Sequence, residues 1–233
     1  MIRNILLDLD NTIFDFTKAE RIALTKTLRA LNIEPEEAVL CRYSELNLEQ
    51  WKLLELGKIS RDQVKLQRFS NLFREFSLTA SPESAAKLYE NFLGQGHYYI
   101  DGAQDLLKTL QGRYRLYLAS NGTTGVQMGR LASAGITEVF EEIFLSEKIG
   151  ADKPEKAFFD ACFSYIPDFR KEETVIVGDS LTSDIKGGKN AGIGTIWYQP
   201  DPEKQPEEIQ PEEIQPDYRI RHLSELPALL EIL

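Results

Sequence analysis

A short apolar run lies at residues 5–9, and further short apolar runs alternate with amphipathic stretches along the chain after Gly94. A brief apolar run bounded by turn residues is typical of a strand buried on both faces, whereas an apolar period of 3.6 residues is typical of a helix. These patterns predict strands at 5–9, 116–120, 143–145, 173–177 and 194–198, and helices at 124–134, 156–165 and 185–191. Strands that alternate with helices indicate a parallel sheet with helices on both faces. The predicted fold class is therefore α/β and doubly wound.

Residues 17–92 follow a different pattern. Apolar positions recur at helical spacing, as at Ile22, Leu24, Leu28 and Leu31, and polar breaks separate about four such segments without a convincing strand between them. The sequence thus predicts a small all-helical domain of residues 17–92, inserted after the first strand. The remaining residues, 1–16 and 93–233, are predicted to form a discontinuous Rossmann-like core.

A repeat lies near the C-terminus, where Gln-Pro-Glu-Glu-Ile occupies 205–209 and again 210–214. Proline at every fifth position opposes a helix, and the acidic residues favour hydration, so a surface loop is predicted. A last short strand at 218–221 and a helix at 224–233 are expected after it.

Charge and composition exclude several classes of function. The formal net charge of the 233 residues is −10, which repels the phosphate backbone of nucleic acids and argues against a nucleic acid polymer as partner. No apolar stretch approaches the roughly 18 residues of a membrane span, and the N-terminus does not resemble a signal peptide, so no membrane partner and a cytoplasmic location are expected. Cys41 and Cys162 fit no metal or redox spacing and are expected to be unpaired thiols.

Four polar motifs each follow a predicted strand. In a parallel α/β sheet the carboxyl ends of the strands meet at one edge, where ligands bind, so the motifs are expected to form one site. Their residues are Asp8, Asp10 and Thr12 in the first, Ser120, Asn121 and Gly122 in the second, Lys153 in the third, and Asp179 and Asp184 in the fourth.

These residue types point to phosphoryl transfer. Two carboxylates in close sequence, Asp8 and Asp10, are unfavourable together unless a cation or protons neutralise them, and Mg²⁺ suits a site made of oxygen ligands. One carboxylate can attack phosphorus and the other can transfer a proton. A serine hydroxyl, an amide, loop N–H groups and a lysine can hold phosphate oxygens, and glycine lets the backbone approach closely. Asp179 is placed to complete the metal site, with Asp184 as a supporting residue.

The chain resembles the haloacid dehalogenase-like superfamily over nearly its whole length, because Asp8-x-Asp10-x-Thr12, Ser120, Lys153 and Gly178-Asp179-x4-Asp184 match that superfamily's four motifs in order. The resemblance implies that Asp8 is the nucleophile and Asp10 the general acid and base. It also implies Mg²⁺ bound by Asp8, the Asp10 backbone carbonyl and Asp179. Ser120, Lys153 and Asn121 would bind the phosphoryl group, with Thr12 as a further candidate, and the insert would be the cap domain.

Further details favour one branch of the superfamily. Asp10 argues for phosphoryl transfer, because the dehalogenating branch lacks an acid at that position. The Ser120-Asn121-Gly122 segment, Ser146 to Gly150, and Leu56 to Ser60 in the insert resemble the bacterial pyrimidine 5′-nucleotidases. The expected substrate is a small phosphorylated metabolite, and a nucleoside 5′-monophosphate is favoured.

Alternatives remain open at this point. A sugar-phosphate phosphatase or phosphomutase would use the same motifs, whereas a non-catalytic binding protein would be expected to lose at least one motif residue, and none is lost. Trp51, Tyr43 or Arg42 of the insert is hypothesised to touch the leaving group, although Trp51 also suits packing between helices. The oligomeric state is left between monomer and homodimer.

Overall fold

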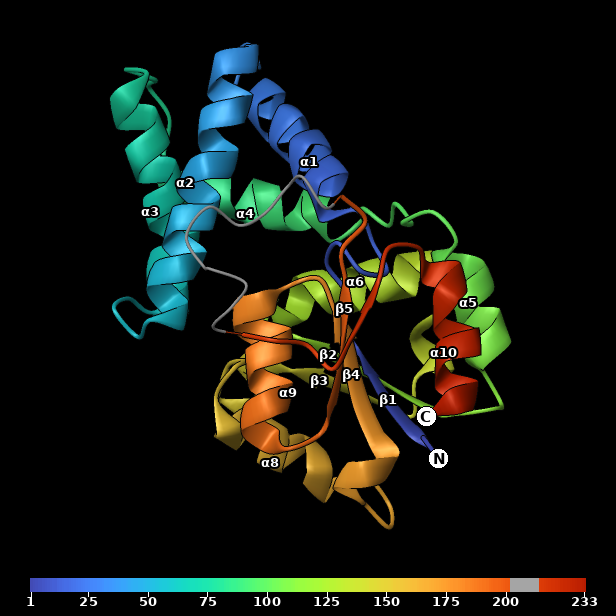
Figure 1. Cartoon of the computed structure of the whole chain (residues 1–233). Coiled ribbons are helices and arrows are strands. Elements are labelled where there is room, and N and C mark those ends of the chain that lie inside the picture. Colours follow the sequence, from blue (N-terminus) through green and yellow to red (C-terminus); the bar gives the residue numbers. More distant parts are fainter. Residues whose placement is uncertain (202–213) are drawn as a thin grey trace. The chain divides into compact units, whose positions relative to one another are not determined.

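The computed structural model describes residues 1–201 and 214–233, and the chain divides into two compact units (Figure 1). Unit 1 comprises 1–15, 98–124 and 134–233, and unit 2 comprises 16–97 and 125–133. The predicted division into 1–16 with 93–233 and 17–92 stays a prediction. The repeat at 205–214 lies outside the described residues except for Ile214.

Unit 1 contains a six-stranded sheet in the order β3-β2-β1-β4-β5-β6, with every neighbouring pair parallel. Every residue of the central strands β1 and β4 is buried, as is typical of parallel strands that are covered on both faces. The strands are β1 (Asn4–Leu7), β2 (Arg115–Ser120), β3 (Glu142–Leu145), β4 (Thr174–Gly178), β5 (Gly194–Tyr198) and β6 (Tyr218–Ile220).

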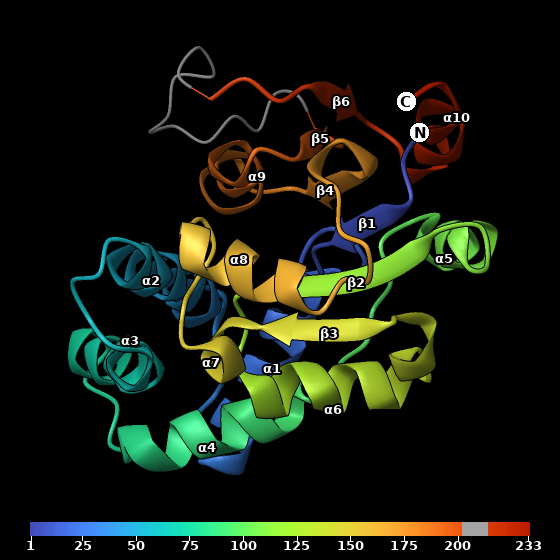
Figure 2. The ribbon, with the colours of Figure 1, turned by 90° about the horizontal axis from the view of Figure 1, so that it is seen from below.

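Helices cover both faces of this sheet. Figures 1 and 2 show α8 (Lys156–Ser164) and α9 (Lys186–Ala191) on one face, and α5 (Ala103–Leu110) and α10 (Leu226–Ile232) on the other. On the first face, Phe158 and Phe159 pack with side chains of four strands in one buried cluster. The shorter helices of the unit are α7 (Ser146–Ile149) and the 3-10 turns η1 (Thr137–Val139), η2 (Lys171–Glu173) and η4 (Leu223–Glu225).

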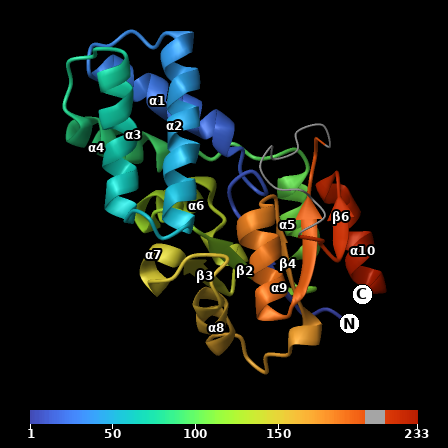
Figure 3. The same ribbon diagram turned by 60° about the vertical axis from the view of Figure 1, so that its left-hand side comes forward.

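Unit 2 is helical, and Figure 3 shows its helices α1 (Phe16–Ala30), α2 (Glu37–Glu55), α3 (Arg61–Glu75) and α4 (Pro82–Leu93). Ser60 and Ser81 cap α3 and α4 by accepting hydrogen bonds from backbone N–H groups of the first turn. The helices enclose an aromatic cluster of Tyr43, Phe69 and Tyr89, whose ring centroids lie 5.0 to 5.7 Å apart. Residues 125–133 of α6 (Thr124–Ala134) also belong to this unit.

The structure confirms the predicted parallel α/β core, with an all-helical insert between the first two strands. Several details differ from prediction. Lys153 was expected to follow a strand, but helix α7 lies between β3 and Lys153, so the lysine follows a helix. The first strand ends at Leu7 rather than residue 9, because the chain turns there and the N–H of Phe14 donates to the Leu9 carbonyl at 2.8 Å. Helix α5 was not predicted, because two turns are too short for the apolar period to stand out. A π-helical turn, η3 (Leu181–Ile185), precedes α9 where a helix from residue 185 was expected.

Among the described residues, no helix combines the length and the apolar character that crossing a bilayer requires.

Gly188 of α9 leads to a test of this packing. A methyl group at Gly188 would lie 2.6 Å from both the Ile176 and Thr195 Cγ2 atoms, which belong to strands β4 and β5. Gly188→Ala is therefore expected to lower the free energy of unfolding by about 1–3 kcal/mol, because overpacking outweighs the better helix propensity of alanine. Chemical denaturation monitored by circular dichroism measures this. The matched control is Gly125→Ala in α6, where nothing lies within 4 Å, and no loss of stability is expected there.

Candidate active site

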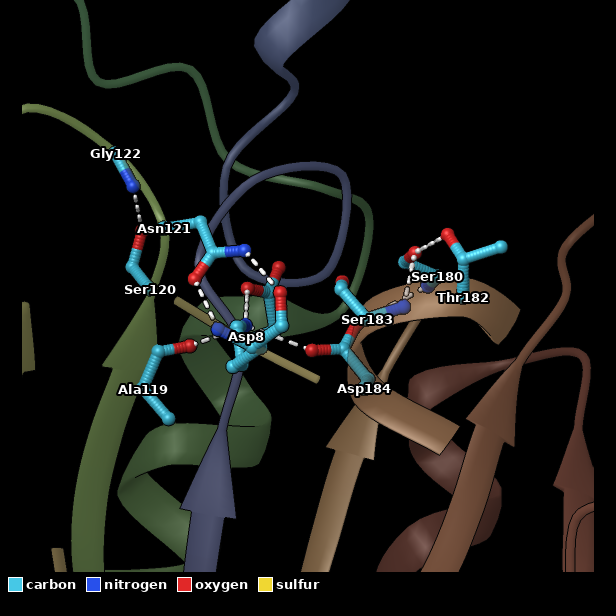
Figure 4. Close-up of polar contacts among 10 residues, drawn as sticks. Asp8, Ala119, Ser120, Asn121, Gly122, Ser180, Thr182, Ser183 and Asp184 are labelled. Atoms are coloured by element: carbon cyan, nitrogen blue, oxygen red, sulfur yellow. Dashed lines mark hydrogen bonds and ion pairs between the residues drawn. The ribbon is translucent and has the colours of Figure 1, made fainter. Parts of the chain in front are cut away.

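Three neighbouring strands bring the predicted residues together at one edge of the sheet. Asp8 follows β1, Ser120 ends β2, and Asp179 follows β4, and these strands are adjacent in the order β2-β1-β4. Figure 4 shows Asp8 between Ala119 and Ser120 on one side and Asp184 on the other. Parallel pairing places the carboxyl ends of the strands side by side, so residues more than 100 positions apart in sequence converge here.

Lys153 supplies the central positive charge of the site. Its side chain is 2% exposed, and its ammonium nitrogen lies 2.7 Å from Asp8 Oδ1 and 2.7 Å from Asp184 Oδ1. The same nitrogen donates to the Ala119 carbonyl at 2.6 Å. A lysine ammonium has three N–H donors, so these contacts match all three. Lys153 thereby joins the ends of β1 and β2 and the turn after β4.

Asn121 is held against the backbone of Lys153. Its amide nitrogen donates to the Lys153 carbonyl at 2.9 Å, and its amide oxygen accepts from the Lys153 N–H at 2.8 Å. Next to it, the Ser120 hydroxyl accepts from the N–H of Gly122 at 3.1 Å. The three residues of the second motif therefore lie together at the end of β2, but the Asn121 amide contacts Lys153 in addition to any role at the phosphate.

The fourth motif depends on the π-helical turn after β4. The Ile185 N–H donates to the Ser180 carbonyl five residues earlier at 3.1 Å. Asp184 is 1% exposed, and its Oδ2 accepts from the Ser180 N–H at 3.1 Å. A Cβ on Gly178 would lie 2.1 Å from that same oxygen, so glycine is required where strand and turn meet. Single-turn π segments often occur at functional sites.

Trp197 lies at the site but belongs to none of the four sequence motifs. The indole N–H of Trp197, at the end of β5, donates to the backbone carbonyl of Asp179 at 2.8 Å. The indole also packs with Leu181 and Ile185 of the π-helical turn. Trp197, which lies in the neighbouring strand β5, therefore contacts the loop that carries Asp179. Its position at a strand end is the only sequence feature that points to it.

Asp10 and Thr12 lie in the tight turn after Asp8. Asn11 adopts a left-handed φ of 59°, which asparagine tolerates better than most residues, and its N–H donates to the Phe14 carbonyl at 2.7 Å. The turn leaves Asp10 partly exposed beside Asp8. Thr12 is fully buried, and its hydroxyl has no hydrogen-bond partner within the described part of the chain. A role for Thr12 in binding phosphate stays a prediction.

The electrostatics of the site are dominated by crowded carboxylates. Burial raises the pKa of Asp8 to about 7, assisted by Asp184 and Asp10 and opposed by Lys153. Burial, together with Asp8 and Asp184, also raises the pKa of Asp179. Burial alone would lower the pKa of Lys153, but Asp184 and Asp8 raise it, so the ammonium stays charged. One ammonium therefore faces several carboxylates.

Comparison with known proteins agrees with this geometry. The family model described as haloacid dehalogenase-like hydrolase matches residues 5–198. The chain belongs to this family. The resemblance predicted from the motifs is thus confirmed, as is the prediction that the chain is an enzyme of the hydrolase class.

Three relatives of this hydrolase are informative. The HAD-hydrolase YfnB of Bacillus subtilis is 41% identical over 230 residues, covering 99% of this chain and 96% of YfnB. A crystal structure of YfnB bound to magnesium matches with a TM-score of 0.91 over 98% of each chain. The pyrimidine 5′-nucleotidase PynA of Streptococcus pneumoniae is 43% identical over 84% of this chain and 83% of PynA. The pyrimidine 5′-nucleotidase YjjG of Escherichia coli is 29% identical over 97% of this chain and 96% of YjjG.

The residues of the site fit a divalent cation. Asp8, Asp179 and Asp184 each offer a carboxylate oxygen, and these oxygens lie within 4.8 Å of one another. Such an all-oxygen donor set suits Mg²⁺, and a dication would offset the negative charge that Lys153 leaves unbalanced. Asp184 already contacts Lys153 and the Ser180 N–H, and its supporting role stays a prediction. We expect Asp8 and Asp179 to be the carboxylate ligands.

The three hypothesised leaving-group residues lie in unit 2. Tyr43 has no exposed surface and packs with Phe69 and Tyr89. The structure therefore corrects the hypothesis that Tyr43 touches the leaving group, because Tyr43 is an interior packing residue. The Arg42 guanidinium forms a two-pronged ion pair with Glu75. Trp51 is partly buried beneath the Arg61 guanidinium, which lies 5.5 Å from its ring centroid. Contact of Arg42 or Trp51 with the leaving group stays a prediction.

The raised pKa of Asp8 predicts how stability depends on pH. Because the folded protein holds the Asp8 proton more tightly than the unfolded chain does, the metal-free protein is expected to lose stability as pH rises from about 4 to about 7. Mg²⁺ competes with that proton, so it is expected to raise Tm more at pH 8 than at pH 5.

Thermal unfolding with EDTA and with Mg²⁺, at both pH values, measures this effect. Asp8→Asn is expected to flatten the pH dependence and to reduce the Mg²⁺ effect. An equal Mg²⁺ effect on Tm at pH 5 and pH 8 would contradict the assignment.

Proposed function

We propose that this hydrolase is a Mg²⁺-dependent phosphatase that acts on a small phosphorylated metabolite, with a nucleoside 5′-monophosphate as the favoured substrate. The observation that carries the proposal is the position of Asp8. It is a carboxylate at a strand end, 2.7 Å from a buried ammonium, with a second aspartate two residues further on. The names of PynA and YjjG, both pyrimidine 5′-nucleotidases, support the substrate class.

In the first half of the reaction, a carboxylate oxygen of Asp8 attacks phosphorus and the bond from phosphorus to the ester oxygen breaks. Asp10 gives its proton to that oxygen, which leaves as an alcohol. The Lys153 ammonium and the N–H groups of the second motif stabilise the negative charge on the phosphoryl oxygens. Mg²⁺ bound at Asp8 and Asp179 would neutralise the same charge and orient the phosphoryl group.

In the second half, Asp10 takes a proton from water while the water oxygen attacks the phosphorus of the aspartyl phosphate. The bond from phosphorus to Asp8 breaks, which restores the carboxylate and releases inorganic phosphate. Asp10 thus acts as acid and then as base, which suits a partly exposed carboxylate in the turn beside the nucleophile. The predicted cytoplasmic location and the choice between monomer and homodimer stay predictions.

Removing the nucleophile tests the mechanism. Asp8→Asn preserves the shape of the side chain but replaces the carboxylate by a poor nucleophile, so release of phosphate in the presence of Mg²⁺ is expected to fall to background. Asp10→Asn is expected to lower kcat by about 10²–10⁴-fold, because only proton transfer is lost. The matched control is Asp105→Asn on α5, where the side chain is 86% exposed, and its activity is expected to equal that of the unaltered enzyme. Full activity in folded Asp8→Asn would refute the covalent mechanism.

A substrate panel tests the substrate class. We expect higher kcat/KM for pyrimidine nucleoside 5′-monophosphates than for hexose and triose phosphates, measured by release of inorganic phosphate. Hydrolysis of sugar phosphates alone would retain the mechanism but replace the substrate. Transfer of the group to a second sugar without release of phosphate would favour a phosphomutase, and no turnover of any compound would remove the phosphatase proposal.

A further inference from the structure

The Asn121 side-chain amide and the Lys153 peptide are joined by two hydrogen bonds, in the way that peptide groups of neighbouring strands pair in a β-sheet. One N–H of the Asn121 amide donates to the Lys153 carbonyl at 2.9 Å, and the Asn121 amide oxygen accepts from the Lys153 N–H at 2.8 Å. These distances lie at the centre of the range for N–H···O hydrogen bonds. Between α7 and α8 the chain forms neither helix nor strand, so this pair ties Lys153 to the end of β2.

The position of the Lys153 ammonium depends on its backbone. The side chain is buried, and its nitrogen has to reach Asp8, Asp184 and the Ala119 carbonyl at the same time. A displaced backbone could not satisfy all three acceptors, and a buried ammonium that lacks a partner is strongly unfavourable. The position of the Lys153 peptide therefore matters for these contacts, and the Asn121 side chain is hydrogen-bonded to both its N–H and its carbonyl.

Asparagine provides both the donor and the acceptor that pair with the Lys153 peptide, and aspartate or alanine would not. Aspartate could accept from the Lys153 N–H, but its second oxygen would face the Lys153 carbonyl, and two acceptors repel. Alanine provides neither contact. The oxygen and one N–H of the Asn121 side chain are engaged with the Lys153 peptide, and the binding of phosphate expected from the sequence stays a prediction.

We propose that Asn121 is a positioning residue that acts through Lys153, by fixing the Lys153 peptide at the end of β2. The structural part of this inference is independent of the reaction, and its kinetic part rests on the proposed phosphatase function. A displacement of about 1 Å at a catalytic group can lower the rate by about 100-fold. Loss of the Asn121 amide is expected to have an effect of that order on kcat/KM.

The first experiment needs no enzymatic activity. In ¹⁵N NMR spectra of lysine ammonium groups, buried Lys153 is expected to give a slowly exchanging signal, assigned by its loss in Lys153→Met. We expect Asn121→Ala and Asn121→Asp to remove or broaden this signal, with the fold verified by circular dichroism. The control, Asn91→Ala on the exposed surface of α4, is expected to retain it. An unchanged Lys153 signal in both folded Asn121 variants would overturn the inference.

The second experiment is a double-mutant cycle on kcat/KM. If Asn121 acts only through Lys153, Asn121→Ala is expected to lower kcat/KM by about 100-fold in the unaltered enzyme but by less than about twofold in Lys153→Met. Equal losses in both backgrounds would show that Asn121 contacts the substrate itself and would overturn the inference. An inactive unaltered enzyme would instead refute the proposed function, and the NMR experiment would still decide the position of Lys153.

Discussion

The site depends on one buried ammonium that two carboxylates share. Lys153 holds Asp8 and Asp184 at equal distance, and without it the strand ends would bring together negative charges that repel one another. The surrounding features are consistent with this constraint. Asn121 fixes the peptide of the lysine, Gly178 leaves room for the carboxylate of Asp184, and the π-helical turn brings that carboxylate back towards the sheet.

The same arrangement opposes stability and favours chemistry. Carboxylates that are buried together raise one another's pKa, so the metal-free site concentrates negative charge unfavourably at the edge of the sheet. Proteins retain such an unfavourable arrangement where function requires charges that are already oriented before the substrate arrives. The apolar strands on either side, with Leu6, Val177 and Ile176 fully buried, provide the rigid support that keeps these charges in place.

Much of the fold could be predicted from the sequence, because a parallel strand covered on both faces is continuously apolar and its carboxyl end is marked by polar residues. Asp8 and Ser120 could therefore be assigned to one site from the sequence, whereas Lys153 and Asp184 lie beyond a further helical turn and were assigned by the order of the motifs. The contacts of Asn121 and Trp197 could not, because each depends on which backbone atoms lie opposite across a strand end. The π-helical turn was also missed, since its apolar pattern matches that of an ordinary helix start. Helix α5 is too short for its period to be recognised.

The hydrogen bond from the Trp197 indole to the Asp179 carbonyl also makes the fluorescence of Trp197 a probe of the active site. The chain has two tryptophans, and the other, Trp51, lies in the helical unit. The Trp197 indole is 3% exposed, and its N–H is bonded to the loop that carries an expected metal ligand. Replacing Trp51 by phenylalanine would leave Trp197 as the one tryptophan, and its emission is expected to change when the environment of that loop changes.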